Sequence, residues 1–321
     1  MRVYLSLKSL WRRVYKIKNY LVFGANGFIG ASLVEALSKD NLVYAIDRYS
    51  KPEIFRLNKR IKKIKEDVRK GSEILKKLKN VNVDGVVWLV GGVIPADKLD
   101  KERNILAATI SIADIIRPYM ESKKPVVVAS SAGMLYAPGK TQLTERSRID
   151  PWTWYGLEKL IMEKNLQLLA KDLDNENLRI LRISSVYGER QPTDREQGVV
   201  AKLLNSALKN DTFNLYGSEL ARRDYIYVGD LVEIIEKFLK QKTKHQIYNV
   251  STGKARSLKE VIETIEGITK KKIKTIKKNK RNIDPIDIEV SNKLLLREFD
   301  LNFTSFKEGL RKTIRWYESS Q

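Results

Sequence analysis

The sequence predicts an α/β fold, in which helices cover both faces of a doubly wound parallel sheet and a smaller C-terminal α/β lobe follows. Strand-like apolar runs alternate with helical patterns, the first run breaks into spaced glycines, and the second ends in an acid. Such alternation is typical of βαβ units. The expected strands are 21–23, 42–46, 61–65, 83–90, 126–130 and 178–183, and the expected helices are 28–37, 71–79, 99–120, 155–173 and 308–317.

The stretch YLVFGANGFIG, residues 20–30, organises the rest of the chain. Its glycines at 24, 27 and 30 predict a strand, a tight turn and the start of a helix. In such a turn the first glycine bends the chain, the second lets a pyrophosphate approach the backbone, and the third packs the helix on the strand. The phosphate then binds free N–H groups of the helix. Glycine-rich turns also occur as ordinary structural turns.

The residues that follow favour a dinucleotide site of the Rossmann type. The second apolar run ends in Asp47, about twenty residues beyond the first glycines, where a carboxylate can accept hydrogen bonds from the adenosine ribose. Asp47 would repel a ribose 2′-phosphate, although the adjacent Arg48 could partly offset that repulsion. The expected cofactor is therefore NAD rather than NADP. A strand-end cap is the alternative role for Asp47.

Composition argues against several kinds of catalyst. The chain has 321 residues and is 42% hydrophobic, which suits one large α/β unit or two closely joined domains. It has no cysteine, so disulfides, a thiolate nucleophile and a cysteine metal site are excluded, and a reducing compartment is favoured. The single histidine, His245, argues against a Ser-His-Asp triad or a histidine metal site, and we expect it in an exposed loop. No metal is expected.

The formal net charge of +22 implies either an acidic partner or a lysine-rich surface without specific meaning. We find no nucleic-acid-binding pattern, expect no nucleic acid, and favour a solvated basic face whose densest part is 270–281. No apolar segment approaches the roughly twenty residues of a membrane span. The basic extension 1–18 has an amphipathic pattern, which leaves two alternatives: peripheral contact with an anionic membrane, or packing on this protein or a partner subunit.

The expected chemistry centres on Tyr155 and Lys159, within WYGLEK. Residues four apart lie on one face of a helix, so the ammonium can stabilise the phenolate and help the tyrosine act as a general base. Taken alone, the pair also fits a partly exposed aromatic beside a solvated lysine. The dinucleotide motif upstream favours the catalytic role.

With these motifs the sequence resembles the extended short-chain dehydrogenase/reductases, the NAD-dependent epimerase/dehydratase family. The resemblance covers roughly 18–317, nearly the whole chain. It rests on GANGFIG, Asp47, Asp67-Val68, SSAGMLY, YGLEK, LRISSVYGERQ, RRDYIYVGD and IYNVSTGKARSL, which follow the family's order. The family's members are epimerases, dehydratases and reductases of nucleotide sugars.

The resemblance implies roles for individual residues. Tyr155 should be the acid/base, Lys159 should hold the nicotinamide ribose, and Ser131 or Ser130 should hydrogen-bond the reacting sugar hydroxyl. Ser131, Ser185 and Arg223 should contact substrate, with Arg223 gripping the diphosphate unless it pairs with Asp224 instead. The cofactor-binding set is Gly24, Asn26, Gly27, Phe28, Ile29, Gly30, Asp47, Arg48, Asp67, Val68, Val90, Gly91, Tyr155 and Lys159.

The sequence departs from the family's pattern at three positions. Ala132 stands where many 4-epimerases have a third small hydroxyl residue, so the serine role falls on Ser131. Ser185 replaces a common asparagine, which puts a substrate or backbone contact in doubt. Gly229 replaces a frequent aspartate, and we expect Asp230 to cap the helix that follows.

The resemblance leaves more than one reaction open. A dehydratase or decarboxylase would need acidic residues where this chain has Ala132-Gly133-Met134, and a 3,5-epimerase/reductase would need a cysteine and a histidine. A 4-epimerase is favoured, a 4-ketosugar reductase is the alternative, and a silent NAD-binding scaffold is the third hypothesis. The resemblance also implies a homodimer through helices 99–120 and 155–173, a cytoplasmic location and a role in polysaccharide biosynthesis.

For domain organisation we expect an extension over 1–18 and a Rossmann domain over 19–183, completed by 224–250. The substrate-binding lobe should comprise 184–223 and 251–321. It should lie over the carboxyl ends of the strands, where open α/β sheets bind their ligands.

Overall fold

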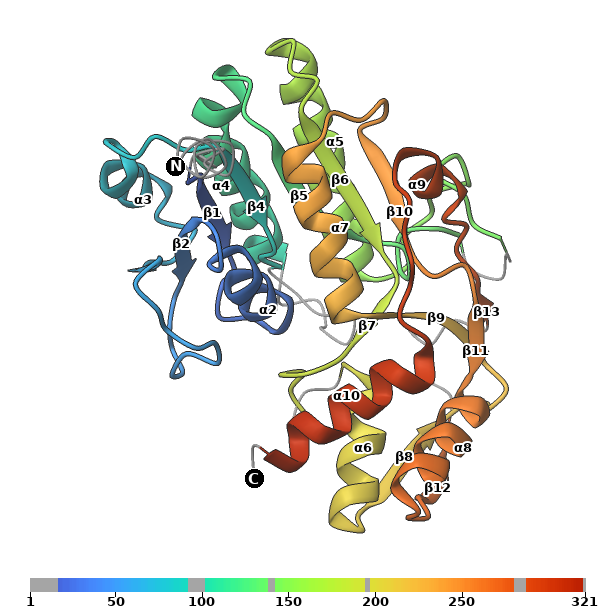
Figure 1. Ribbon diagram of the computed structural model, residues 1–321. Coiled ribbons are helices and arrows are strands. Elements are labelled where there is room, and N and C mark those ends of the chain that lie inside the picture. The colour runs from blue at the N-terminus through green and yellow to red at the C-terminus, as the bar shows by residue number, and fades with distance from the viewer. Residues whose placement is uncertain (1–16, 92–101, 138–141, 194–196, 280–286, 320–321) are drawn as a thin grey trace, which may run out of the picture.

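The central sheet of the computed structural model has seven parallel strands in the order β10-β6-β5-β4-β1-β2-β3 (Figure 1). The structure describes residues 17–91, 102–137, 142–193, 197–279 and 287–319. The strands are β1 (Asn19–Phe23), β2 (Leu42–Asp47), β3 (Ile61–Lys65), β4 (Gly85–Trp88), β5 (Val126–Ser131), β6 (Leu178–Ile183) and β10 (Ile247–Val250). The strand order reverses between β1 and β4, so ligands are expected at the carboxyl ends of these strands. The predicted fold class is confirmed.

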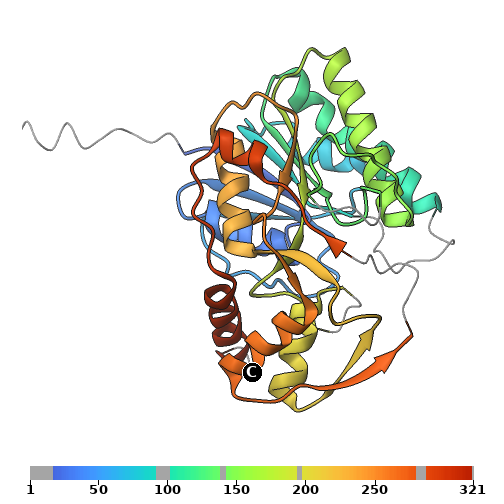
Figure 2. The ribbon, with the colours of Figure 1, turned by 90° about the vertical axis from the view of Figure 1, so that its right-hand side faces the viewer.

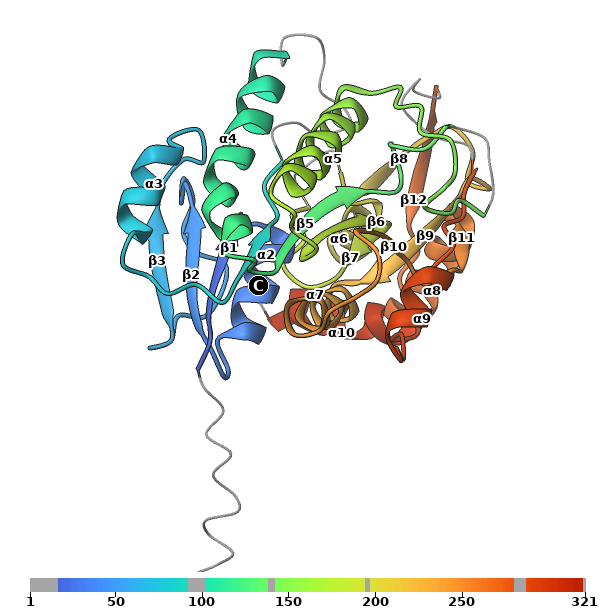
Figure 3. The same ribbon diagram turned by 90° about the horizontal axis from the view of Figure 1, so that it is seen from above.

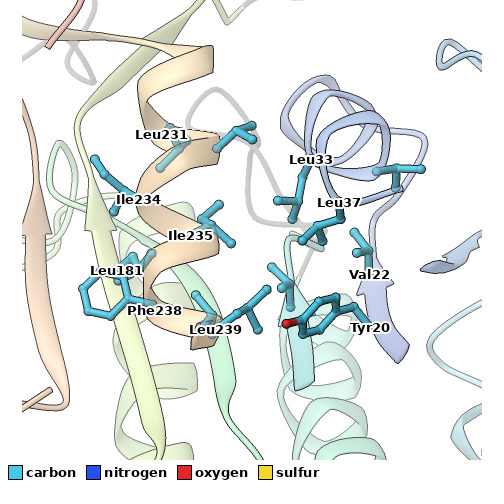
Figure 4. Packing of buried hydrophobic residues seen from close by; sticks show 14 of the residues in the cluster. Tyr20, Val22, Leu33, Leu37, Leu181, Leu231, Ile234, Ile235, Phe238 and Leu239 are labelled. Carbon is cyan, nitrogen blue, oxygen red and sulfur yellow. The ribbon is translucent and has the colours of Figure 1, made fainter. Parts of the chain in front are cut away.

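Helices cover both faces of this sheet (Figure 3). On one face lie α2 (Phe28–Leu37) and α7 (Val228–Lys240), and on the other α3 (Gly71–Leu78), α4 (Glu102–Glu121) and α5 (Trp154–Asp172). Figure 4 shows Leu33 and Leu37 of α2 packing with Val22, while Leu231, Ile235 and other residues of α7 pack beside Leu181. The inner strands β1, β4 and β6 are buried on both sides, which explains their nearly continuous apolar sequences, whereas the edge strand β3 is largely exposed and reads IKKIK.

The C-terminal lobe extends from the carboxyl ends of β5 and β6 (Figure 2). Its first sheet contains β7 (Ser185–Tyr187), β9 (Arg222–Tyr227), β11 (Ala255–Ser257) and β13 (Asp287–Ile288), and its second pairs β8 (Thr212–Tyr216) with β12 (Lys274–Lys278). The helices α6 (Val199–Lys209), α8 (Leu258–Thr269) and α10 (Phe306–Ser319) pack with these strands around a third core, whereas α9 (Lys293–Glu298) packs beside β10. We keep the domain boundaries given above as a proposal.

The described residues agree closely with the expected elements. Strands β3 and β6 and helix α2 have the predicted bounds, whereas β4 is shorter than predicted, and residues 99–101 of the predicted helix 99–120 lie outside the described residues. His245 lies in an exposed loop, as predicted. The basic stretch is exposed along β12, although 280–281 lie outside the described ranges, as does most of the 1–18 extension. No helix within the described ranges is long and apolar enough to cross a membrane.

The prediction that Asp230 caps α7 is wrong. The N-cap is Tyr227, without a side-chain cap, and Asp230 instead accepts hydrogen bonds from the backbone N–H and hydroxyl of Thr304 at 2.9 and 2.6 Å. Asp230 therefore ties α7 to the segment that leads into α10. Gly229 is required by packing, because a Cβ there would lie 2.5 Å from the ring of Tyr227.

Candidate functional site

The glycine turn joins β1 to α2 in a tightly constrained geometry. Gly24 has a φ of +79°, and its N–H donates to the Ile46 carbonyl at 3.0 Å. A Cβ on Gly30 would lie 2.1 Å from the Gly24 carbonyl oxygen, so only glycine allows α2 to approach the turn this closely. Gly27 is the N-cap of α2 and provides no side-chain cap. The first amides of α2 are therefore suited to a pyrophosphate, and the turn fits a dinucleotide.

Asp47 lies at the end of β2, against this turn. Its carboxylate accepts the backbone N–H of Asn26 at 3.0 Å and that of Tyr49 at 3.4 Å. The side chain of Asn26 points elsewhere: its amide donates to the carbonyls of Lys51 and Pro52, and its oxygen accepts the N–H of Ile54 at 3.0 Å. Asn26 thus holds the loop of residues 51–56, called the 51–56 loop below, against the glycine turn.

The other residues expected around the adenosine lie at the ends of neighbouring strands. Asp67 and Val68 follow β3, and Arg48 is exposed directly after Asp47. The Arg69 guanidinium donates to both carboxylate oxygens of Asp67 and, against the effect of partial burial, lowers the pKa of that carboxyl to about 2. Val90, whose backbone nitrogen is 3.2 Å from a Cβ built on Gly24, and Gly91 follow β4. All these positions lie at the carboxyl ends of β2, β3 and β4.

Tyr155 and Lys159 lie on the first turns of α5. The Lys159 ammonium is 5.4 Å from the centre of the Tyr155 ring, and Lys159 is buried whereas Tyr155 is partly exposed. Thr153 caps the helix by accepting the Gly156 N–H at 3.1 Å. A Cβ on Gly156 would lie 2.1 Å from the Met134 carbonyl oxygen. The start of α5 therefore packs directly on the turn after β5, which brings the tyrosine and lysine beside that turn.

The two serines at the end of β5 have different environments. The Ser130 hydroxyl donates to Glu163 at 2.6 Å, and Glu163 pairs with Arg182 of β6 at 2.7 Å. All three side chains are buried. Burial alone lowers the pKa of Arg182, but the hydrogen bonds and charge of Glu163 raise it overall, so the guanidinium stays protonated. Ser131 points to the other face of the strand, as successive strand residues do.

The predicted substrate residues Ser185 and Arg223 lie in the lobe. Ser185 begins β7 and pairs in register with Tyr225 of β9. Asp224 is buried and accepts hydrogen bonds from Ser184, from Thr252 and from the backbone N–H of Lys254. Burial raises the pKa of Asp224, and these hydrogen bonds offset part of that effect. Arg223 precedes Asp224 in the strand and therefore points away from this buried cluster.

The lobe also contains a cavity of about 290 Å³ between α6 and β8. Its lining is largely polar and includes Lys202, Asn205, Asn214 and Tyr216. The apolar residues Phe213 and Leu215 of β8 are buried, whereas Thr212, Asn214 and Tyr216 between and beside them are exposed on the side of the cavity.

Comparison with known families decides the class of this chain. Residues 20–251 match the model of the NAD dependent epimerase/dehydratase family. The chain belongs to this family. As an epimerase/dehydratase family member it has NAD as its cofactor. The glycine turn, Asp47 and the Tyr155–Lys159 pair are the residues predicted to hold that dinucleotide.

Individual relatives of this epimerase/dehydratase family member include both epimerases and a reductase. The chain is 30% identical over 257 residues to dTDP-4-dehydro-6-deoxyglucose reductase of Escherichia coli, covering 77% of this chain and 80% of the relative. It is 28% identical to a putative UDP-glucose 4-epimerase of Methanocaldococcus jannaschii, and the match covers 94% of this chain and 98% of the relative. A crystal structure of Thermus thermophilus UDP-glucose 4-epimerase with NAD has a TM-score of 0.84 at 25% identity, covering 94% of this chain and all of that one.

These similarities make the protein an NAD-dependent enzyme of the nucleotide-sugar epimerase and reductase type. Sequence reasoning missed three features of the structure. They are the Glu163–Arg182 pair behind Ser130, the attachment of the 51–56 loop by Asn26, and the cavity in the lobe. Helical spacing places Tyr155, Lys159 and Glu163 on one face of α5. This spacing was the sequence signal from which a role for Glu163 could have been predicted.

Proposed function

We propose that the enzyme is a nucleotide-sugar 4-epimerase that transiently oxidises C4 of the sugar. The observation that carries this proposal is the contact of Lys159 with Tyr155, at 5.4 Å from the ring centre, on a helix packed directly against the turn after β5. As a phenolate, Tyr155 can accept a proton from a bound hydroxyl, and as a phenol it can return that proton. The alternative pairing of Tyr155 with a solvated lysine is not supported, since Lys159 is 4% exposed.

In the proposed cycle Tyr155 removes the proton from the sugar 4-hydroxyl and later returns it to the oxygen of the 4-keto sugar. Lys159 holds its ammonium over the Tyr155 ring. Ser131 hydrogen-bonds the reacting oxygen, because the Ser130 hydroxyl is committed to Glu163. A bound NAD supplies the acceptor and then the donor of the C4 hydride. The 4-keto sugar must turn over between the two steps to give the epimer.

The lobe is suited to hold the nucleotide diphosphate. The cavity between α6 and β8 offers amide groups, the Lys202 side chain and the half-exposed ring of Tyr216 to a nucleotide base and its ribose. Arg223, on β9, is the residue we propose for the diphosphate, since a guanidinium binds phosphate oxygens in a bidentate manner. Ser185 is proposed as a weaker contact from β7.

A 4-ketosugar reductase is the second candidate. Its support is the Escherichia coli relative, a dTDP-4-dehydro-6-deoxyglucose reductase that is 30% identical to this chain. A reductase would use the same tyrosine to donate a proton but would consume one reduced cofactor per turnover. The two candidates therefore differ in whether cofactor must be exchanged.

The deciding experiment is incubation with a panel of UDP-, GDP- and dTDP-sugars, followed by NMR and mass spectrometry. We expect one UDP-hexose to be converted to its 4-epimer with only bound NAD. Stoichiometric loss of NADH or NADPH with a 4-keto sugar would instead identify a reductase. If wild-type protein oxidised no sugar of the panel, the silent-scaffold hypothesis would replace both.

We also propose that the enzyme forms a cytoplasmic homodimer through α4 and α5. Leu168 of α5 is 62% exposed, and we expect the dimer contact to cover it. Light scattering of the wild type and of Leu168→Glu tests this pairing. Membrane contact through 1–18 remains a separate proposal, tested by flotation with anionic vesicles.

A further inference from the structure

The 51–56 loop is hydrogen-bonded by residues of two separate regions, the glycine turn and the lobe. On the first side, Asn26 bonds the loop with its side chain while its own N–H donates to Asp47 at 3.0 Å. Phe55 anchors the loop in the core beneath α2. The loop therefore borders the carboxylate that we assign to the adenosine ribose.

On the second side, the loop is bonded by Arg190, which follows β7 in the lobe. The Arg190 Nε donates to the Ile54 carbonyl at 3.1 Å, and its guanidinium donates to Glu35 of α2 at 2.7 Å. The other oxygen of Glu35 accepts the N–H of Arg56 at 2.7 Å. The guanidinium carbon also lies 6.0 Å from the centre of the Trp316 ring of α10. One side chain thus joins α2, the loop and the lobe.

The geometry of Arg190 differs from that of an ordinary surface arginine. Arg190 and Glu35 are 15% and 26% exposed, whereas Arg148 and Asp150, an ordinary exposed pair, are 73% and 52% exposed. Arg190 also has a φ of +67°, in the left-handed region that is unfavourable for residues other than glycine.

We propose that Arg190 is a positioning residue for the cofactor, which fastens the 51–56 loop to the lobe and thereby slows release of NAD from its adenosine end. The connection requires no contact between Arg190 and the dinucleotide. For the loop to swing away from Asp47, the bond from Arg190 to the Ile54 carbonyl and the bond from the Arg56 N–H to Glu35 must break, and the ion pair between Arg190 and Glu35 holds these two attachment points together. Phe28, beside the glycine turn, packs against the lobe core as well, so the lobe covers this end at a second point.

The attachment of the 51–56 loop to the lobe through Arg190, called the latch from here on, bears on the choice between the two candidate reactions. An epimerase must keep its cofactor between oxidation and reduction, whereas a reductase must exchange it at each turnover. An attachment that slows exchange is consistent with the first. The proposed role of Arg190 depends on the predicted NAD site. Only its link to epimerisation rests on the proposed function.

The test is the rate at which protein-bound NAD exchanges with isotopically labelled NAD in the absence of any sugar. We expect Arg190→Gln to exchange about tenfold faster than wild type, since it loses charge-assisted hydrogen bonds. Arg311→Gln is the matched control, because Arg311 pairs only loosely with Glu308 on α10, at 3.6 Å, and does not touch the loop. Its exchange rate should equal that of wild type.

Glu35→Gln should accelerate exchange less, because the bond to Ile54 remains, and the double variant should exchange no faster than Arg190→Gln alone. An unchanged rate in folded Arg190→Gln, as judged by circular dichroism, would overturn the latch. If Arg190→Gln does not fold, an unchanged rate in Glu35→Gln overturns it equally. Since no sugar is present, the outcome is independent of whether the enzyme is an epimerase or a reductase.

Discussion

The two ends of the NAD site are built in different ways. At the sugar end, Tyr155 and Lys159 come from one helix, and that helix is fixed to β5 and β6 by the buried Glu163–Arg182 pair. At the adenosine end, the glycine turn is supplemented by a surface loop and by Arg190, which is 136 residues away from Ile54. The sugar end is therefore rigid through burial, whereas the adenosine end depends on a few partly exposed polar contacts.

This difference has a functional meaning. The reacting groups must keep their geometry through every turnover, and burial in close-packed surroundings provides that. Cofactor must still enter at some stage, which requires an end that can open.

The largest effect is expected from Glu163→Gln. The substitution leaves the Arg182 charge buried without its partner, which we expect to cost about 3–5 kcal/mol of unfolding free energy. Denaturant unfolding measures it. Glu66→Gln, which breaks the exposed pair with Lys77, should change the stability little. If Glu163→Gln lowered the free energy of unfolding no more than this control does, the Glu163–Arg182 pair would not be what holds the sugar end.

An intermediate effect is expected at the glycine turn. Gly30→Ala places a Cβ against the Gly24 carbonyl, which should lower stability by about 1–3 kcal/mol and weaken NAD binding. Its control is Gly267→Ala in α8, where no atom lies within 4 Å of the added carbon. That variant should be more stable by about 0.5–1 kcal/mol, since alanine favours a helix. Thermal unfolding with and without NAD compares the two, and equal NAD affinities would refute the role of the turn.

The smallest effect is expected from Arg69→Gln at the exposed edge. Arg69 lowers the pKa of Asp67 from 3.8 to about 2, so the pair stabilises the folded state above pH 4 and loses this contribution as the pH falls toward 2. Arg69 is 55% exposed, which keeps the contribution small. The melting temperatures of wild type and variant should therefore differ slightly at pH 7 and converge on acidification. If the difference in melting temperature widened at low pH, Arg69 would not be lowering the pKa of Asp67.

The same contrast explains what the sequence could predict. The glycine turn, Asp47 and Tyr155–Lys159 are local patterns, and each lies within a single turn, strand end or helix. Most sheet strands were also predictable, because each is an apolar run bounded by turn residues. For Asp230 we expected the local role of a helix cap, whereas its partner Thr304 is 74 residues away.

The contacts that sequence did not predict join distant segments. Arg190 was noted only as part of YGERQ, and its partner Glu35 lies 155 residues earlier on the polar side of α2. The helical spacing predicted the face of α5 on which Glu163 lies, but it did not predict the contacts of Glu163 with Ser130 and Arg182. Such pairings depend on how strands and helices stack in three dimensions, which a single sequence without aligned relatives does not specify.

The proposed role of Tyr155 in direct transfer of hydride from and back to C4 is tested by a substrate deuterated at C4. The UDP-hexose turned over in the panel would be incubated with enzyme carrying only bound NAD, in ordinary water, and its 4-epimer examined by NMR. We predict that the product retains the deuterium at C4 and that Tyr155→Phe binds NAD normally but forms product about 10²- to 10⁴-fold more slowly. Loss of the deuterium to solvent, or undiminished turnover by Tyr155→Phe, would contradict the account.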